Sequence, residues 1–389
     1  MAQCDKRQRI RLLMIVGGLN LGGIERLITD MCRVLIRCGK YDISICCLLS
    51  KDGPFLNDIE SMGVAVYECL RRSSWRFVKF TRNLTDLMRV IRPDIVHSHL
   101  HWSVPSQVLA ARASGVPSII ITRHRIAVRT GLSLARQRIY AGLMRRSINL
   151  FTAVSEAVRD NIAQHGWATS DDNIAVIPNG IDLSVFGSNS LDNDTAKRRL
   201  GLGTKPIVGT VGSLRPDKGH KYLIEASRKI LDTGIDCRFV IIGSGNLQAE
   251  LEDQISKLGL VADVSLLGSQ RDIPELLSAL DVFVLPSVSE GQGIALVEAL
   301  ASGLLCIGSN VGGIPEVLDG GRAGILVPPK DPQALAKAII EVLSNKERAM
   351  QLSAAAKERA KAFSIETCVA EYEKIYRQLI MKNGYNEHR

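Results

Sequence analysis

Short apolar runs alternate with helix-patterned stretches along almost the whole chain, and this alternation limits the possible folds more than any other feature. Such runs, separated by enough residues for a helix, predict βα units and parallel sheets. The runs in the first half are Ile10–Val16, Ile43–Leu49, Val64–Tyr67, Asp94–Val96, Ser118–Thr122 and Leu150–Val154, and those in the second are Ile207–Val211, Arg238–Ile242, Val264–Leu267, Val282–Leu285, Leu304–Ile307 and Ile325–Val327. The sequence therefore predicts an α/β protein with two βα domains.

The two domains are expected to join near Ile177–Asp182, where IPNGID interrupts the pattern. We expect one domain over residues 1–183 and the second over 184–364, followed by a C-terminal helical segment over 365–389. The stretch Ser184–Lys205 is polar and irregular and is interpreted as a linker with a short helix. A chain of 389 residues with 46% apolar residues is large enough for two cores.

The segment Pro286–Gly303, PSVSEGQGIALVEALASG, carries the strongest chemical pattern. Two carboxylates, Glu290 and Glu298, bracket a glycine-rich turn that leads into an apolar helix. Gly291 and Gly293 have no Cβ, so a ligand can approach the backbone closely, and the helix start offers free N–H groups. A nucleotide sugar fits, because it combines an anionic part with hydroxyl groups. The alternative is an ordinary turn followed by a solvated helix.

A cationic loop, Gly212–Gly219, follows the apolar run Ile207–Val211 and precedes a helical stretch. Arg215 and Lys218 therefore lie at the carboxyl end of a predicted strand, where open α/β sheets bind ligands. A guanidinium can bind two phosphate oxygens at once, and an ammonium adds a point charge. The alternative is a pair of solvated surface cations.

A second glycine loop, Gly17–Gly23, follows the first apolar run and opens a helix near Ile24. It lacks a dinucleotide-binding fingerprint, so a plain tight turn remains an alternative. Lys6, Arg7, Arg9 and Arg11 precede the apolar stretch Leu12–Val16 and thereby imitate a signal peptide. The apolar core is short, and we favour a first strand over a signal peptide.

Three histidines, His97, His99 and His101, alternate at the end of a predicted strand. Alternation places them on one side while the strand lasts, which permits a metal site, but no nearby Asp, Glu or Cys completes a set of ligands. His124 and Arg123 end the next strand. An Asp-x-Asp pattern, which can hold a metal ion in other proteins, occurs at Asp192–Asp194, but it lies in the polar linker with no strand before it, and we assign it no role.

Positive charge is concentrated in the first half of the chain. Residues 1–183 carry 25 Lys and Arg against 15 Asp and Glu, whereas residues 184–389 carry 24 against 25. In Arg71–Arg82, cations are interleaved with Trp75, Phe77 and Phe80, and Arg123–Arg129 forms a second cluster. This pattern suits a membrane surface with anionic lipid better than nucleic acid, for which no motif is present. The alternative is a solvated helix face whose aromatic side chains pack inward.

Nine cysteines occur without a CxxC spacing, and several, such as Cys46, Cys47 and Cys306, fall within apolar runs. Buried, reduced thiols in a cytoplasmic protein are the expectation. The nearest candidate for a membrane span, Gly293–Gly313, contains Glu298 and several glycines and is interpreted as helix, strand and loop instead.

The order and spacing of these motifs resemble the retaining GT-B glycosyltransferases of family 4. The resemblance covers roughly residues 10–380 and rests on GGLNLGGIER, PDIVHSH, TAVSEAV, IPNGID, GSLRPDKG, ALDVFVLPS, SEGQGIALVEA and GGIPEVL. It implies two Rossmann-like domains facing a central cleft, closure on donor binding, and a last helix that returns to the first domain.

The resemblance also implies roles for individual residues. Arg215 and Lys218 would neutralise the donor diphosphate, Glu290 would hold hydroxyls of the transferred sugar, and Glu298 those of the ribose. His99 would hydrogen-bond the sugar, Arg271 would lie beside the base, and His124 and Arg123 would face the acceptor. Backbone contacts to sugar and phosphate would come from Gly22, Gly23, Gly291, Gln292, Gly293 and Ile294.

The implied chemistry is front-face substitution without an enzymic nucleophile, in which the leaving diphosphate helps to take the acceptor proton. The donor charge is expected to be balanced by Arg215, Lys218 and helix ends, so neither a metal nor another cofactor is expected. UDP is expected as the nucleotide ahead of GDP. Gln292 departs from the apolar residue of many family members, which weakens inference about the sugar.

The expected function is transfer of a hexose or N-acetylhexosamine to a hydroxyl of a lipid-linked or other glycan acceptor. The enzyme would be cytoplasmic and in peripheral contact with an anionic membrane surface, and would act in surface polysaccharide assembly. Two alternatives remain, which are another enzyme on the same fold, such as a nucleotide-sugar epimerase or a phosphorylase, and a non-catalytic glycan-binding subunit. A non-catalytic subunit would be expected to have lost the charged residues that bind the donor. This chain has all four of them, namely Arg215, Lys218, Glu290 and Glu298.

Overall fold

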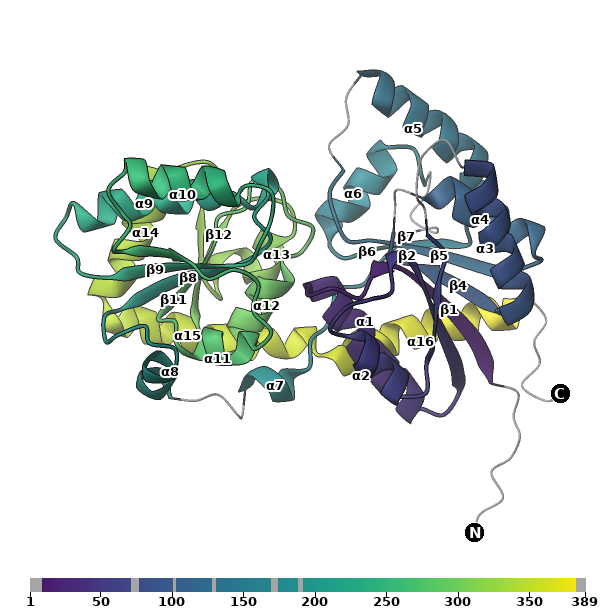
Figure 1. Cartoon of the computed structure of the whole chain (residues 1–389), viewed down its shortest axis with the longest axis horizontal. Coiled ribbons are helices and arrows are strands. Elements are labelled where there is room, and N and C mark those ends of the chain that lie inside the picture. The colour runs from purple at the N-terminus through teal and green to yellow at the C-terminus, as the bar shows by residue number, and fades with distance from the viewer. Residues whose placement is uncertain are drawn as a thin grey trace, which may run out of the picture. The chain divides into compact units, whose positions relative to one another are not determined.

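The computed structural model describes residues 9–70, 77–100, 103–127, 131–168, 174–187 and 192–382. The chain forms two compact units (Figure 1). Unit 1 consists of Met1–Gly180 together with Ile365–Arg389, and unit 2 consists of Ile181–Ser364. The boundary lies at Ile181 instead of residue 184, and the C-terminal helix belongs to unit 1.

Unit 1 is built on a seven-stranded parallel sheet with the order β3-β2-β1-β4-β5-β6-β7. Its strands are β1 (Ile10–Gly18), β2 (Tyr41–Ser50), β3 (Ala65–Glu68), β4 (Ile95–Ser98), β5 (Ser118–Arg123), β6 (Leu150–Ala153) and β7 (Ile174–Val176). Six of these strands lie within or around the predicted apolar runs. The seventh, β7, was not predicted, because three residues at a sheet edge are too short to show a pattern.

Helices cover both faces of this sheet (Figure 1). One face packs against α3 (Phe77–Ile91), α4 (Val104–Ala113), α5 (Gly131–Met144) and α6 (Glu156–Gln164), with the turn η2 (Arg145–Ser147) after α5. The other packs against α1 (Gly23–Arg37), α2 (Leu56–Ser61) and the last helix, α16 (Ile365–Lys382). Alternate residues of β1 enter the two cores: Leu13 and Ile15 enter one, and Leu12 and Met14 the other.

Unit 2 has a six-stranded parallel sheet with the order β10-β9-β8-β11-β12-β13. Its strands are β8 (Ile207–Val211), β9 (Arg238–Ile242), β10 (Val264–Leu266), β11 (Val282–Leu285), β12 (Leu305–Ser309) and β13 (Ile325–Val327). All six were predicted, because buried parallel strands appear in the sequence as nearly continuous apolar runs.

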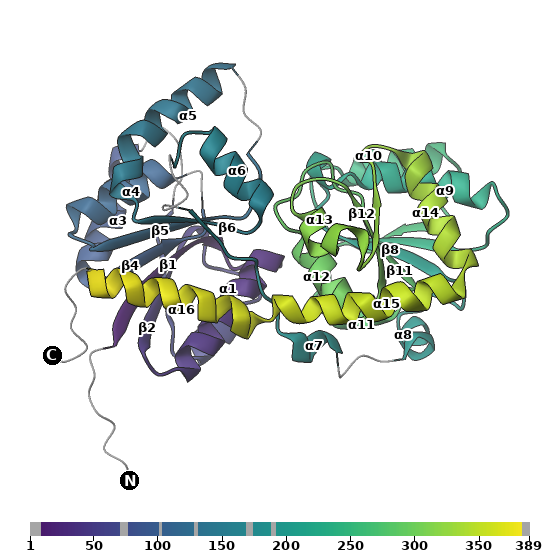
Figure 2. The same cartoon turned by 180° about the vertical axis from the view of Figure 1, so that it is seen from behind.

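Two helical layers also cover the sheet of unit 2, as the reverse view in Figure 2 shows. One layer consists of α9 (His220–Leu231), α10 (Gln248–Lys257) and α14 (Pro332–Ser344). The other core includes α7 (Leu183–Gly187), α8 (Asn193–Arg199), α11 (Ile273–Ser278), α12 (Ile294–Ala301), α13 (Ile314–Val317) and α15 (Lys346–Ala360). Short 3-10 turns are η4 (Pro216–Lys218), η5 (Asp319–Gly321) and η6 (Lys361–Phe363).

The predicted linker contains α7 and α8 and is anchored to unit 2. Asp192, from the Asp-x-Asp pattern, caps α8 by accepting a hydrogen bond of 2.9 Å from the Thr195 N–H. Lys197 is buried and pairs with Asp281 at 2.7 Å. The expectation that the Asp-x-Asp pattern has no role is therefore wrong for Asp192, which is a helix cap.

All eight cysteines in the described part of the chain are free, and seven of them are buried. Cys46, Cys47 and Cys306 are among the buried ones, as predicted. Cys38 is exposed.

Each sheet has one place where the strand order reverses. In unit 1 this switch lies between β1 and β4, and in unit 2 it lies between β8 and β11. The connections on either side of a switch leave over opposite faces, which opens a crevice at the carboxyl ends of the two strands. The Gly17–Gly23 loop and His99 follow the switch strands of unit 1, whereas Arg215 and Glu290 follow those of unit 2.

The loops beyond β8 and β11 are held together by backbone contacts. The Asp217 carbonyl oxygen accepts hydrogen bonds from the N–H groups of Val288 and Ser289, at 2.8 and 3.2 Å. Gly219 has φ +67°, and a Cβ there would overlap the carbonyl oxygen of Pro286. Only glycine accommodates both the left-handed backbone and the close approach.

We therefore expect Gly219→Ala to destabilise unit 2 more than Gly259→Ala. Both glycines have φ +67°, but a Cβ at Gly259 meets no atom within 4 Å. The left-handed backbone costs an alanine about 1–2 kcal/mol at either site. Overlap with Pro286 adds about 1–3 kcal/mol at Gly219 only. Urea unfolding of the two variants measures the difference, and equal losses would contradict the described loop contact.

Candidate functional site

The cationic loop of unit 2 is shaped by proline and glycine. Pro216 opens the turn η4, where its missing N–H costs nothing, and Gly219 ends the turn in the left-handed region. Arg215 precedes the turn, and its Nη2 donates to Asp217 Oδ2 at 2.7 Å. Its Nε is buried without a hydrogen-bond partner in the part of the chain that the structure describes. Arg215 thus has donor capacity left for a ligand.

Lys218 and Glu290, predicted from two separate motifs, meet directly. Lys218 Nζ donates to Glu290 Oε2 at 2.6 Å, and both side chains are largely buried, at 18% and 10% exposed. Ser287 Oγ donates to the same carboxylate oxygen at 3.0 Å. Within the described residues, Oε1 therefore remains available to accept hydrogen bonds. The structure brings a cation and a carboxylate to the switch between β8 and β11.

The helix α12 begins where the glycine-rich turn ends. Gly293, with φ +92°, is its N-cap, and the Gly293 carbonyl accepts from the N–H groups of Leu296 and Val297. Ile294 is the first helical residue, so its N–H lies among those without an acceptor inside the helix. Glu298 and Gln292 are both buried, at 5% and 3% exposed. A solvated Glu298 is thus excluded.

The candidate base contact, Arg271, lies apart from this group. It is exposed, follows the edge strand β10 and immediately precedes Asp272, which caps α11. Nearer the switch, the loops after β9 and β10 meet: Gly243 N–H donates to Gly268 O at 2.8 Å, and the Ser244 and Ser269 hydroxyls lie 2.6 Å apart. Arg271 thus follows a strand that lies two places from β8 in the sheet, and its contact with the base stays a prediction.

In unit 1, Gly22 is the N-cap of α1 and Gly23 its first residue. A Cβ at Gly22 would overlap the Glu25 carboxylate, which lies over this helix start. Burial raises the pKa of Glu25, against the effects of its own backbone N–H and of Arg125. A carboxylate of the chain thus lies where an anionic ligand was expected, and the contact of Gly22 and Gly23 with a diphosphate stays a prediction.

The two histidine candidates of unit 1 lie together. His99 Nδ1 and His124 Nε2 are 3.0 Å apart, and both side chains are buried, as is the neighbouring Arg123. His97, also on the same side of the sheet, is bound instead by side chains of the protein core, at 2.7 Å from Tyr376 and 2.6 Å from Thr122. His101 lies outside the described residues.

Burial keeps these imidazoles neutral. Desolvation lowers the pKa of His97 to about 3, and the pKa of His99 falls well below its ordinary value, through burial first and the neighbouring His97 and His124 second. Burial likewise lowers the pKa of His220 to about 4 in unit 2. A neutral His99 can hydrogen-bond a hydroxyl but is a poor proton acceptor at neutral pH. Its contact with the transferred sugar stays a prediction. The described residues contain no group of three or more His, Cys, Asp or Glu arranged to hold a metal ion.

Sequence reasoning missed several residues around these sites. The backbone of Asp217 joins the two loops of unit 2, Ser287 fixes Glu290, and His220 lies 3.2 Å from the Ser213 carbonyl. Asp217 and Ser287 lie inside the quoted motifs and could have been found there. Tyr376 meets His97 across 279 positions, and no local pattern predicts that contact.

Comparison with protein families gives two matches that together cover most of the chain. The family model described as Glycosyltransferase Family 4 matches residues 21–185, and that of glycosyl transferases group 1 matches residues 192–359. The matches therefore fall one on each unit of the structure.

Two curated relatives align along most of their length. The chain is 30% identical over 318 residues to the putative glycosyltransferase EpsF of Bacillus subtilis, covering 80% of this chain and 81% of EpsF. It is 29% identical over 335 residues to the Escherichia coli UDP-Gal:alpha-D-GlcNAc-diphosphoundecaprenol alpha-1,3-galactosyltransferase, covering 84% and 86%.

Solved structures share the fold. Anabaena HepE in complex with UDP and glucose gives a TM-score of 0.83 at 21% identity, covering 95% of this chain and all of that one. WaaG, a glycosyltransferase involved in lipopolysaccharide biosynthesis, gives 0.77 at 16% identity, covering 94% and 99%. Both have the GT-B fold of two Rossmann-like domains that was expected here.

The buried histidines make stability depend on pH. The pKa values of these histidines in the folded protein lie below the unfolded value of about 6.5. Their contribution to the free energy of unfolding is therefore fully present above pH 6.5 and is lost as the pH falls toward 4. Each such imidazole costs about 1.4 kcal/mol per pH unit in that window. We expect His220→Phe to flatten the pH dependence of urea unfolding by this amount for one group. Parallel pH profiles of variant and wild type would contradict the neutral, buried state of His220.

Proposed function

This chain is a glycosyltransferase of family 4, and from that premise we propose that it is a retaining hexosyltransferase or N-acetylhexosaminyltransferase. The chain acts on nucleotide sugars in glycoconjugate biosynthesis. The proposed donor is a UDP-sugar, with GDP as the alternative. The proposed acceptor is a hydroxyl of a lipid-linked glycan in surface polysaccharide assembly.

The observation that carries the proposal is the meeting of Lys218 and Glu290 at the switch point of unit 2, 2.6 Å apart and beside Arg215. A nucleotide sugar needs cations for its diphosphate and acceptors for its sugar hydroxyls. Arg215 Nε and Lys218 supply the cationic groups for the diphosphate, and Glu290 Oε1 supplies an acceptor for a sugar hydroxyl. Glu298 is proposed to hold the ribose, and the backbone of Gly291, Gln292, Gly293 and Ile294 to contact sugar and phosphate.

The proposed reaction breaks the bond between the anomeric carbon and the diphosphate oxygen. The leaving diphosphate takes up the bonding electrons, and Arg215 and Lys218 stabilise the negative charge that develops on it. The acceptor hydroxyl attacks from the same face, and its proton passes to the departing phosphate oxygen. In this proposal His99 forms a hydrogen bond with the sugar, as donor or acceptor, and transfers no proton during the reaction. No metal is assigned a step.

The choice of UDP rests on similar proteins. The E. coli relative is named for a UDP-Gal donor and a diphosphoundecaprenol-linked acceptor, and HepE was solved with UDP and with UDP-glucose. Transfer of these properties to the present chain is a proposal. The same relative supports a lipid-linked acceptor.

We place the proposed membrane contact on the layer formed by α3, α4, α5 and η2. These elements contain eight Lys and Arg and a single acid, Asp86, whereas α1, α2 and α16 on the other face contain six bases and seven acids. The layer also exposes Val78, Leu109, Ile139 and Leu143. Bases and exposed apolar side chains together suit the surface of a bilayer that carries anionic lipid.

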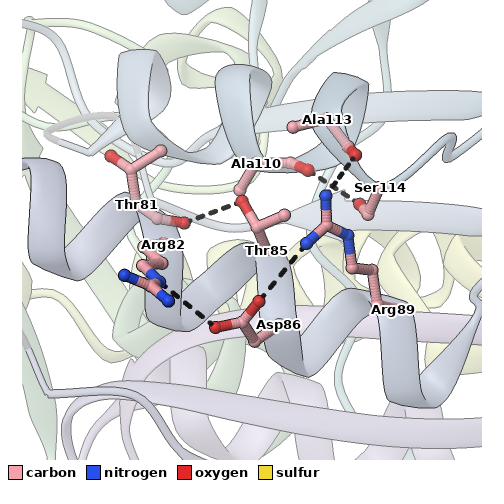
Figure 3. Close-up of polar contacts among 8 residues, drawn as sticks. All are labelled: Thr81, Arg82, Thr85, Asp86, Arg89, Ala110, Ala113 and Ser114. Atoms are coloured by element: carbon pink, nitrogen blue, oxygen red, sulfur yellow. Dashed lines mark hydrogen bonds and ion pairs between the residues drawn. The ribbon is translucent and has the colours of Figure 1, made fainter.

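The structure changes the earlier description of this surface. Phe80 is buried in the core and is not available to lipid, whereas Phe77 is 40% exposed. Among the described residues, the alternative of inward-packed aromatic side chains is therefore confirmed for Phe80 only. Figure 3 shows that Arg82 and Arg89 share the Asp86 carboxylate, at 4.0 and 3.5 Å, and that Arg89 also donates to Ala113 O of α4 at 3.4 Å. Residues 71–76 and 128–130 lie outside the described part. No helix among the described residues is long and apolar enough to span a bilayer.

We expect Lys218→Ala to lower kcat/KM for the donor by about 10–100-fold, because one charge-assisted contact to the diphosphate is lost. Glu290→Gln keeps the shape but weakens acceptance of sugar hydroxyls and is expected to lower kcat comparably. The matched control is Lys221→Ala, an exposed lysine three positions away that packs over the Tyr222 ring. Steady-state kinetics with a UDP-sugar measure all three. Equal activity of Lys218→Ala and Lys221→Ala would contradict the assigned site.

Retention and metal independence are tested on the product. Proton NMR of the anomeric signal is expected to show the same configuration as the donor. Activity is expected to stay within about twofold after dialysis against EDTA, because Arg215 and Lys218 balance the diphosphate charge. An inverted product would refute the retaining proposal, and loss of activity that Mg²⁺ or Mn²⁺ restores would refute the assignment of charge balance to these side chains.

The membrane proposal predicts that Ile139→Ser/Leu143→Ser reduces co-sedimentation with phosphatidylglycerol vesicles several-fold. These residues lie four positions apart on α5 and are 64% and 67% exposed, so their loss leaves the core intact. Val261→Ser, at 71% exposed in unit 2, is the control. The assignment of this surface would be overturned if the wild-type protein did not bind the vesicles. It would also be overturned if the α5 variant bound them as well as the wild type does.

A further inference from the structure

A group of buried polar side chains lies between α16 and the sheet of unit 1, where an apolar core would be expected. His97 on β4 lies 2.7 Å from the Tyr376 hydroxyl through Nδ1 and 2.6 Å from Thr122 Oγ1 through Nε2. Thr122 in turn lies 2.5 Å from Thr152 Oγ1 and 3.2 Å from the Tyr372 hydroxyl. All five side chains are 2% exposed or less. The group joins three neighbouring strands to the C-terminal helix.

The hydrogen bonds in this group have a defined direction. Among the described residues His97 is the only hydrogen-bond partner of the Tyr376 hydroxyl, so Tyr376 donates its hydrogen to His97 Nδ1. A neutral imidazole has one donor and one acceptor, and therefore His97 Nε2–H donates to Thr122. Tyr376 thus determines which nitrogen of His97 carries the hydrogen and fixes the orientation of the ring.

His97 also supports the histidine pair of the candidate site. The rings of His97 and His99 lie 4.1 Å apart, centroid to centroid, and His99 Nδ1 reaches His124 Nε2 at 3.0 Å. His99 follows His97 by two residues, and His124 follows Thr122 by two, so the four side chains lie on one face of β4 and β5 and the chain just after them. The His97–Thr122 contact lies within the sheet and is bound by Tyr376 and Tyr372 of α16. The His99–His124 contact lies just beyond it, at the carboxyl ends of the strands.

We propose that Tyr376 is a positioning residue, which acts through His97 to hold the His99–His124 pair in the orientation that the transfer reaction requires. The α16 helix would then contribute to activity as well as to the core. The inference rests on the proposed function in one respect, which is that His99 contacts the substrate. A satisfied polar network can fix one side-chain arrangement where apolar packing would permit several.

Tyr376→Phe tests the proposal, because it removes one hydroxyl and leaves the ring in place. We expect kcat to fall about tenfold, while KM for the donor and the affinity for UDP stay within about twofold. The matched control is Tyr41→Phe, because the Tyr41 ring packs against Tyr376 in the same core at 5.9 Å and the Tyr41 hydroxyl is not bonded to His97. Tyr41→Phe is expected to keep the wild-type kcat.

A spectroscopic measurement separates positioning from a general loss of packing. In protein with 15N-labelled histidine, His97 is expected to show the hydrogen on Nε2 in the wild type and in Tyr41→Phe, and a mixture of tautomers in Tyr376→Phe. If Tyr376→Phe does not fold, Thr122→Val removes the other partner of His97 at nearly constant volume and is expected to lower kcat in the same way.

The outcomes distinguish this inference from the proposed function. If His99→Ala lowers kcat but Tyr376→Phe and Thr122→Val keep the wild-type value, the positioning role is wrong and the proposed function stands. If His99→Ala itself keeps the wild-type kcat, both the role of His99 and the inference are wrong, whereas the diphosphate site on unit 2 is unaffected. An unchanged His97 tautomer in Tyr376→Phe would also overturn the inference.

Discussion

The reversal of strand order in each parallel sheet is the constraint on which both candidate sites depend. A right-handed crossover from β8 leads toward β9, whereas β11 lies on the other side of β8, so the connections that continue from these two strands cross opposite faces of the sheet and leave the strand ends accessible. In unit 2 this brings GSLRPDKG and SEGQG together from positions about 70 residues apart in the chain. The same reversal in unit 1 places the end of β4, and with it His99, beside the glycine loop after β1.

Charge at these strand ends is balanced within the protein. Burying Lys218 or Glu290 alone would cost several kcal/mol of hydration, and pairing them at 2.6 Å offsets much of that cost. Arg215 is similarly paired with Asp217. In the proposed function, a diphosphate gives both cations a stronger partner, and Glu290 becomes free to accept sugar hydroxyls. Unit 1 instead uses neutral imidazoles, whose burial excludes a role as strong bases.

Local patterns predicted most of the fold and of the unit 2 site, and contacts between distant segments account for the rest. Twelve of the thirteen strands in the described part of the chain were predicted, because buried parallel strands are nearly continuous apolar runs, whereas β7 has only three residues at a sheet edge. Lys218 and Glu290 were predictable because each lies in a loop after a strand. The pairing of His97 with Tyr376 and the placement of Glu25 over the start of α1 depend on packing, and periodicity carries no information about either. The sequence grouped Phe80 with a surface cluster of cations and aromatic residues, but α3 packs on the sheet of unit 1 and buries this side chain.

The most direct test of this account is a calorimetric titration of UDP and GDP into the wild-type protein and into Arg215→Ala/Lys218→Ala. The account predicts that UDP binds the wild type more tightly than GDP does. It also predicts that the double variant binds UDP about 100-fold more weakly, because two charge-assisted contacts to the diphosphate are lost. Equal UDP affinity in the two proteins would contradict the central claim that the switch point of unit 2 holds the donor diphosphate.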